Sequence, residues 1–139
     1  MKVVIDTSVW ISALITKNSK ARDLLRLIFQ KKVLPQISET LFKEYKSVMK
    51  QKKIISLIPL SNDEQELLFN TYLNHFQWNE IYYTWRPNLK DEGDNFLIEL
   101  AVSSGAKAII TYNIKDFKNA ELVFSHKIIT PEDFIKEIS

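Results

Sequence analysis

Short apolar runs that alternate with segments of helical periodicity are the feature that most constrains the fold of this chain. Runs of four or five apolar residues bounded by polar ones are typical of strands buried in a parallel sheet. Between them, apolar residues recur at i, i+3, i+4 and i+7, the spacing of amphipathic helices. Strands that alternate with helices form βαβ units. The pattern therefore predicts an α/β protein with a parallel sheet covered by helices on both faces.

Local signals set the expected order of the elements. Strands are expected at residues 2–6, 33–37, 80–85, 107–111 and 127–129, the second weakened by its proline. A polar loop through Asn18 and Ser19 is expected after the first strand. Five helices are expected. The first covers 21–29, the second begins after a Ser38 cap and reaches Met49, and the third begins after a Ser61–Glu64 capping box and reaches about His75. The fourth runs from about Asp94 to Ser104, and the fifth begins at Pro131. Residues 52–60 fit either the end of one helix or a short helix of their own.

The scarcity of three residue types excludes several kinds of chemistry. The chain has no Cys, which excludes disulfides, thiolate zinc sites, iron–sulfur clusters and cysteine nucleophiles. Its two His are too few for most histidine metal cages, and its two Gly cannot build a phosphate-cradling loop. Catalysis by this chain would therefore depend mainly on carboxylates, hydroxyls, amides, Lys or Arg.

Length and charge suggest one ordinary globular domain. A chain of 139 residues is expected to form a single domain over residues 1–139. Strand-like sequence begins at Lys2, which leaves no room for a signal peptide, and no apolar run approaches the roughly 18 residues of a membrane helix. We expect a cytoplasmic protein without a membrane contact. The net charge of +2 does not by itself indicate nucleic-acid binding.

Polar residues directly follow several predicted strands, where open parallel sheets bind their ligands. They fall into three groups: Asp6, Thr7 and Ser8; Asp91, Glu92 and Asp94; and Thr111, Asn113 and Asp116. Each acid alone also fits a helix cap. Their recurrence at one edge of the sheet favours a shared site.

Helix phase adds Glu44 as a candidate. The apolar stripe of Tyr45, Val48 and Met49 lies on one side of its predicted helix, and Glu44 lies at the border of that stripe. A carboxylate at this position either extends to solvent or points into a cleft.

Five stretches together resemble the PIN-domain nucleases. Asp6-Thr7-Ser8 after an apolar strand resembles the opening of these proteins, and the stretch from Ile37 to Tyr45 resembles their strand end, Ser and inward Glu. The remaining three are the acidic loop and helix of Asp91 to Ala101, the segment from Ser104 to Phe117, and the closing Thr130-Pro131-Glu132-Asp133-Phe134. They occur in order and span nearly the whole chain. The last also resembles a bacterial subfamily described as toxins of toxin–antitoxin pairs.

The resemblance implies a three-layer α/β/α sandwich and a ribonuclease dependent on Mg²⁺ or Mn²⁺. Its acid cluster would comprise Asp6, Glu44 and Asp94, with Asn113 or Asp116 at the fourth position; Asp6, Asp94, Asn113 and Asp116 are the implied metal ligands. We hypothesise hydrolysis of a phosphodiester by metal-activated water, with Thr7, Ser8 or Thr111 placing water or phosphate. The implied partners are RNA, a cognate antitoxin protein and a second copy of the chain.

A run of basic residues is the candidate for contacts with the nucleic-acid backbone. Its members are Lys43, Lys46, Lys50, Lys52 and Lys53, together with Lys17, Lys20 and Arg22. The alternative interpretation is a solvated helix face.

Two other functions compete with the ribonuclease. A PIN-like module that binds RNA or protein with weak or lost catalysis is consistent with Asn113, because an amide brings no negative charge. A phosphatase that uses Asp6 as nucleophile is disfavoured, since the second Asp expected two residues later is replaced by Ser8.

Overall fold

A five-stranded parallel sheet forms the centre of the computed structural model, which describes residues 1–81, 95–117 and 127–138. Its order is β3-β2-β1-β4-β5, and each neighbouring pair is parallel. The strands are β1 (Lys2–Ile5), β2 (Leu34–Ile37), β3 (Gln77–Trp78), β4 (Ala108–Ile110) and β5 (Lys127–Ile129). The predicted parallel sheet is confirmed.

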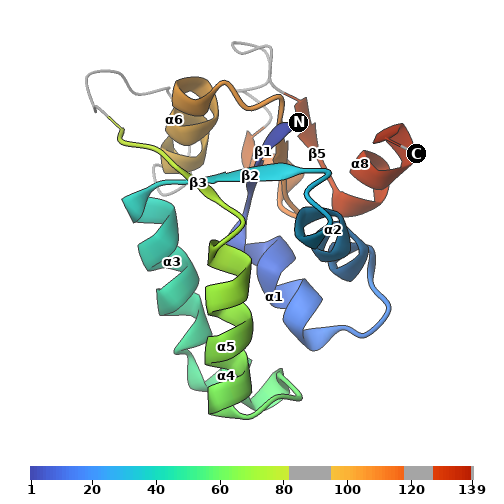
Figure 1. Cartoon of the computed structure of the whole chain (residues 1–139), viewed down its shortest axis with the longest axis vertical. Helices are drawn as coiled ribbons and strands as arrows, with labels where there is room; N and C mark the ends of the chain where they lie inside the picture. The colour runs from blue at the N-terminus through green and yellow to red at the C-terminus, as the bar shows by residue number, and fades with distance from the viewer. Residues whose placement is uncertain (82–94, 118–126, 139) are drawn as a thin grey trace.

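Helices cover both sides of this sheet (Figure 1). They are α1 (Thr7–Ile15), α2 (Lys20–Phe29), α3 (Glu39–Met49), α4 (Lys52–Leu57), α5 (Asn62–Leu73), α6 (Asn95–Ser104) and α8 (Pro131–Ile138), with a short 3-10 helix η2 (Ile114–Phe117). Figure 1 shows α6 on one side of the sheet and α1 and α2 on the other, while α3, α4 and α5 extend away from β2 and β3. The three-layer α/β/α sandwich is confirmed.

Burial of β1 on both faces explains its unbroken apolar sequence. Val3, Val4 and Ile5 are at most 1% exposed. The strand lies third of five, between β2 and β4, so both of its edges and both of its faces are covered. A half-exposed strand would alternate apolar and polar residues, whereas a central parallel strand does not.

The predicted helix ends are confirmed at three positions. The Ser38 hydroxyl accepts the N–H of Leu41 at 3.3 Å and caps α3. Ser61 and Glu64 form the capping box of α5, with side chain to backbone distances of 3.0 and 3.2 Å. Gly105 has a φ of +73°, which lets the chain turn back after α6.

The predicted loop after the first strand is wrong, because α1 begins at once. Asp6 occupies the N-cap position with extended backbone angles, and the helix continues to Ile15. Val9, Trp10 and Ala13 are buried on one side of it. These apolar residues recur at helical spacing, a signal that the polar residues around Asn18 obscured.

The strand predicted at 80–85 is wrong at residues 80 and 81, and the third strand of the chain lies before them. β3 consists of Gln77–Trp78, residues 79–81 are not in a strand, and 82–85 lie outside the described residues. The backbone N–H of Asn79 donates to the Ile37 carbonyl at 2.9 Å, while its side-chain amide donates to the side chain of Gln36 at 3.0 Å. Asn79 therefore holds the chain against β2 where the strand ends.

Pro35 fits inside β2 because the neighbouring strand is short. The N–H of Leu34 donates to Met1 on the β1 side, so by alternation the nitrogen of Pro35 faces the β3 side. β3 pairs only with Gln36 and Ile37. The missing N–H of proline thus removes no bond of the sheet.

Residues 52–60 contain a separate helix, α4, rather than an extension of α3. The longest described helix, α5, has 12 residues. None of the helices in the described ranges is long and apolar enough to cross a bilayer.

The Ser38 cap should contribute measurably to stability. We expect Ser38→Ala to lower the free energy of unfolding by about 1 kcal/mol, because the N–H of Leu41 loses its acceptor at the start of a buried helix. Ser47→Ala, on an exposed position of the same helix, should change it by less than about 0.5 kcal/mol. Urea unfolding measures both; equal effects would contradict the assigned cap.

The capping box of α5 should make stability depend on pH. The Ser61 N–H, helped by the Ser61 hydroxyl, lowers the pKa of Glu64 below its ordinary value of 4.5. A lowered pKa stabilises the folded state above pH 4.5, and this contribution is lost as pH falls through the lower pKa of the folded protein. The difference in Tm between the wild type and Glu64→Gln should therefore shrink between pH 7 and pH 3. A constant difference would contradict this role.

Candidate active site

The carboxyl ends of all five strands form one row of polar residues. Ile5 is in register with Ile110, and Ile110 with Ile129; Ile37 is in register with Trp78. The residues that follow these strand ends are polar: Asp6, Ser38, Asn79, Thr111 and Thr130. Asp6 lies in the middle of this row, because β1 is the central strand.

The Asp6 backbone is fixed by both elements that meet there. Its N–H donates to the Ile110 carbonyl of β4, and its carbonyl accepts the N–H of Val9 in α1, both at 3.0 Å. The residue is only 8% exposed. A carboxylate that is removed from water in this way requires hydrogen-bond partners in the protein.

Three hydroxyls supply those partners. Oδ2 of Asp6 accepts from Thr111 Oγ1 at 2.7 Å and from Ser8 Oγ at 3.1 Å. Oδ1 has a longer contact of 3.5 Å with Thr7 Oγ1. Two hydrogen bonds occupy Oδ2, so Oδ1 is the oxygen with more capacity for a further ligand.

Backbone N–H groups orient two of these hydroxyls. Asn113 donates its N–H to Thr111 Oγ1 at 2.9 Å, and Tyr112 donates its N–H to Ser8 Oγ at 3.3 Å. Because an N–H can only donate, each hydroxyl accepts it and directs its own proton to Asp6. Ser8 and Thr111, predicted to place water or phosphate, thus orient the carboxylate in this structure.

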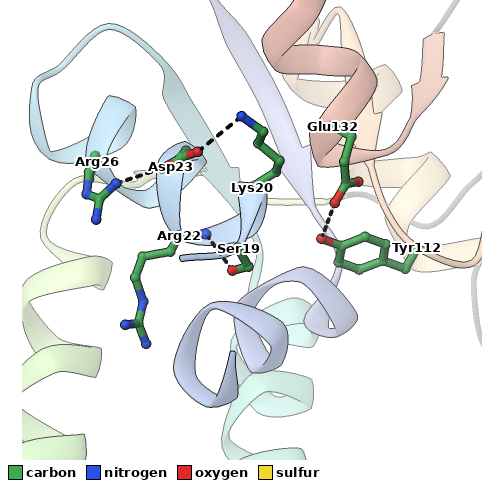
Figure 2. Close-up of polar contacts among 7 residues, drawn as sticks. All are labelled: Ser19, Lys20, Arg22, Asp23, Arg26, Tyr112 and Glu132. Atoms are coloured by element: carbon green, nitrogen blue, oxygen red, sulfur yellow. Dashed lines mark hydrogen bonds and ion pairs between the residues drawn. The ribbon is translucent and has the colours of Figure 1, made fainter. Parts of the chain in front are cut away.

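Tyr112 anchors the turn that supplies these N–H groups. Its hydroxyl donates to Glu132 on α8 at 3.1 Å, as Figure 2 shows. Burial raises the pKa of this phenol, and the Glu132 carboxylate raises it further, against the lowering effect of a hydrogen bond with Ser12. The neutral phenol therefore remains a donor at neutral pH, and α8 holds the turn against the site.

Asn113 and Asp116 lie on the same edge but have exposed side chains. The N–H of Asp116 donates to the Asn113 carbonyl at 3.0 Å, which closes the turn into η2. In the described part of the chain, no hydrogen bond joins either side chain to Asp6. The choice between them for the fourth acid position stays a prediction.

Glu44 is exposed on α3, one residue from a contact with β1. Its neighbour Tyr45 is fully buried and donates its hydroxyl to the Ile5 carbonyl at 2.5 Å. This bond brings the helix segment that carries Glu44 to the residue that precedes Asp6. Among the described contacts, no hydrogen bond joins Glu44 to Asp6.

The predicted acid cluster is not assembled by the described residues alone. Asp94, with Asp91 and Glu92, lies outside them. Among residues 1–81, 95–117 and 127–138, no group of three His, Asp or Glu side chains could hold a metal ion. A cluster around Asp6 thus depends on Asp94 and stays a prediction.

The lysines of α3 lie on the side of the helix away from Glu44. At about 100° per residue, Lys43, Lys46 and Lys50 lie roughly 100–160° around the helix axis from it. Lys43 pairs with Glu39 at 3.2 Å, and Lys46 lies 5.3 Å from the centre of the Phe42 ring. Lys46 and Lys50 line a cavity of about 350 Å³ between α3 and α5. The structure does not bring these lysines together with Asp6.

The basic residues of α2 have partners within the chain (Figure 2). Lys20 and Arg26 pair with Asp23 at 3.6 and 2.6 Å. The Arg22 guanidinium donates twice to the Ala13 carbonyl at the end of α1, at 2.8 and 3.1 Å. The Arg22 side chain therefore joins α2 to the end of α1.

Sequence reasoning missed two buried polar groups, one of which, Tyr45, contacts the residue before Asp6. Tyr45 was counted as an apolar stripe residue, although its position beside a candidate acid was a signal. Glu99 on α6 is only 5% exposed. Among the described residues, Glu99 and Asp6 are the two buried acids. An acid between Ile98 and Leu100 in an apolar helix was the signal for Glu99.

The orienting role of Thr111 is testable by stability. Thr111→Val removes the donor to Asp6 and the acceptor for Asn113, so we expect the free energy of unfolding to fall by about 1–3 kcal/mol. Thr111→Ser, which keeps the hydroxyl, should retain most of the wild-type free energy of unfolding. Thr71→Val, which removes an exposed hydroxyl from α5, is the control and should change it by less than about 0.5 kcal/mol. A Thr111→Val protein as stable as wild type in urea would exclude the role.

Comparison with known proteins identifies the family. A family model described as a PIN domain matches residues 2–115. The uncharacterized protein MJ1680 of Methanocaldococcus jannaschii is 33% identical over 150 aligned positions, which cover 99% of this chain and 91% of that protein. The crystal structure of VapBC2 from Rickettsia felis bound to a DNA fragment from their promoter contains a similar chain, with a TM-score of 0.59 and 16% identity over 92% of this chain and 97% of that one. The last likeness supports the fold, and the family model, which matches residues 2–115, shows that this chain belongs to the PIN-domain family.

Proposed function

We propose that this chain is a ribonuclease that depends on Mg²⁺ or Mn²⁺ and hydrolyses phosphodiester bonds. The observation that carries the proposal is the Asp6 carboxylate, which is buried at the carboxyl edge of the sheet. Two hydroxyls hold one of its oxygens, and the other has only one longer contact, with Thr7. Membership of a family of nucleases supports it.

The donor set at this edge suits a hard cation. Carboxylate and amide oxygens are the ligands that Mg²⁺ and Mn²⁺ prefer, and the chain has no Cys for softer metals. Asp6 would bind through Oδ1, and we propose Glu44, Asp94 and either Asn113 or Asp116 as its companions. A bound divalent cation supplies a Lewis acid that activates water and neutralises charge on the phosphoryl group.

The residues around Asp6 orient its carboxylate for cation binding. Ser8 and Thr111 hold Oδ2, so the carboxylate keeps one orientation whether or not a substrate is present. Pre-set orientation reduces the cost of binding a cation, because side chains need not be ordered at that moment. Thr7, whose contact with Asp6 is the longest of the three, is the hydroxyl that remains most available to place water or phosphate.

A toxin role with an antitoxin partner is part of the proposal. The similar chain in the Rickettsia felis structure belongs to a VapBC2 complex bound to promoter DNA. We propose that this chain likewise has a protein antitoxin and that it forms a homodimer. We also propose that Lys43, Lys46 and Lys50 contact the RNA backbone on a side of α3 different from that of Glu44.

A PIN-like module that binds RNA or protein with weak catalysis is the second candidate. One observation favours it: the turn after β4 carries the uncharged Asn113, whose amide brings no negative charge to a cation. Such a module would bind RNA without cleaving it in the presence of Mn²⁺.

Asp6→Asn and Asp94→Asn should each abolish RNA cleavage that depends on Mg²⁺ or Mn²⁺. Each change removes one negative charge that the cation requires and keeps the shape of the side chain. Gel analysis of RNA incubated with each variant and Mn²⁺ measures the loss, which should exceed 100-fold. Asp63→Asn, at the exposed start of α5, is the control and should cleave like wild type.

Circular dichroism should show the same fold for all three variants. Undiminished cleavage by both Asp6→Asn and Asp94→Asn would refute the assignment of the site. A wild-type chain that binds RNA without cutting it would favour the binding module.

A further inference from the structure

Two buried tyrosines form a hydrogen-bonded chain that ends at the strand before Asp6. Tyr45 on α3 is 0% exposed and Tyr72 on α5 is 1% exposed. The Tyr45 hydroxyl lies 2.5 Å from the Ile5 carbonyl and 3.2 Å from the Tyr72 hydroxyl. A carbonyl can only accept, so the single proton of Tyr45 goes to Ile5 and Tyr72 donates to Tyr45.

Both phenols remain protonated donors at neutral pH. Burial raises the pKa of Tyr45 well above its ordinary value, and the neighbouring Tyr72 and the Asp6 carboxylate raise it further. Burial likewise raises the pKa of Tyr72, more than the hydrogen bond with Tyr45 lowers it. The direction of the chain, from Tyr72 through Tyr45 to Ile5, follows from the Ile5 carbonyl, which can only accept.

The packing of the cluster does not require the Tyr45 hydroxyl. Its ring meets those of Phe69, Tyr72 and Phe76 edge to face, with centroids 5.8–6.3 Å apart. A phenylalanine ring could make the same contacts. The hydroxyl adds one buried polar group, which donates a hydrogen bond to the carbonyl of Ile5, the last residue of β1.

A second contact fixes the far end of α3. The indole N–H of Trp10 in α1 lies 3.3 Å from the sulfur of Met49, and the Trp10 ring stacks on Tyr72 at 4.0 Å with an angle of 7°. Glu44 lies on α3 between Met49 and the amino end of the helix, next to Tyr45. Both contacts hold α3, the helix that carries Glu44, against α1 and β1.

We propose that Tyr45 is a positioning residue of the cation site, whose hydroxyl fixes the placement of Glu44 relative to Asp6. Tyr45 follows Glu44 in sequence, and Ile5 precedes Asp6, so one hydrogen bond joins the neighbours of both acids. Tyr45 is buried and contacts no substrate. The inference rests on the proposed function, since it assigns a role to Tyr45 only if Asp6 and Glu44 hold a cation.

Mn²⁺ binding to the whole chain tests the proposal without a cleavage assay. Isothermal titration should give an affinity about tenfold lower for Tyr45→Phe than for wild type, because groups that orient metal ligands typically affect affinity by 10–100-fold. Tyr72→Phe is the matched control: it removes one phenolic hydroxyl from the same buried pair but leaves the bond to Ile5. It should bind Mn²⁺ like wild type.

The outcomes separate this inference from the proposed function. If Asp6→Asn abolishes Mn²⁺ binding while Tyr45→Phe binds like wild type, the positioning role is wrong and the cation site stands. If Tyr72→Phe loses as much affinity as Tyr45→Phe, the effect reflects general loosening of the core, and the specific role is again wrong. If wild type does not bind Mn²⁺, or binds it as well with Asp6→Asn, both the proposed function and this inference fail.

Discussion

Parallel pairing of β1 with a strand on each side is the constraint on which the rest of the structure depends. It buries the strand completely and aligns its carboxyl end with those of β2 and β4. Each of these strands ends in isoleucine and is followed by a polar residue: Asp6, Ser38 and Thr111. Polar groups that were far apart in sequence therefore meet at one edge, where the helices leave the sheet.

Burial of the Asp6 carboxylate at that edge determines the character of its surroundings. A carboxylate withdrawn from water is costly unless hydrogen bonds replace its hydration. Here the replacement comes from hydroxyls whose own orientation is fixed by the backbone of residues 112 and 113. The turn after β4 is thus part of the site even though its side chains are exposed. A buried hydroxyl also contacts the residue before Asp6, since the backbone carbonyl of Ile5 accepts a hydrogen bond from Tyr45 on α3.

Much of the fold could be predicted because the signals are local. Apolar runs identified four of the five strands, and the serine caps of α3 and α5 were read from one residue and its neighbours. Local signals failed at α1, where a loop was predicted. The polar residues around Asn18, after the helix, were a stronger signal than the short buried stripe of Val9, Trp10 and Ala13. β3 was not predicted, because its two residues are a strand only through their pairing with Gln36 and Ile37.

The sequence by itself determined that this is an α/β chain with candidate acids after its strands, and that a metal site without thiolate ligands would depend mainly on oxygen ligands. These conclusions depend on periodicity and composition, which are properties of the chain alone. The tertiary structure decided what each polar group does: Ser8 and Thr111 hold Asp6, Tyr45 holds the end of β1, and the lysines of α3 face away from Glu44. Those assignments depend on distances between residues as far apart as Asp6 and Thr111, which only the packing of helices against the sheet can define.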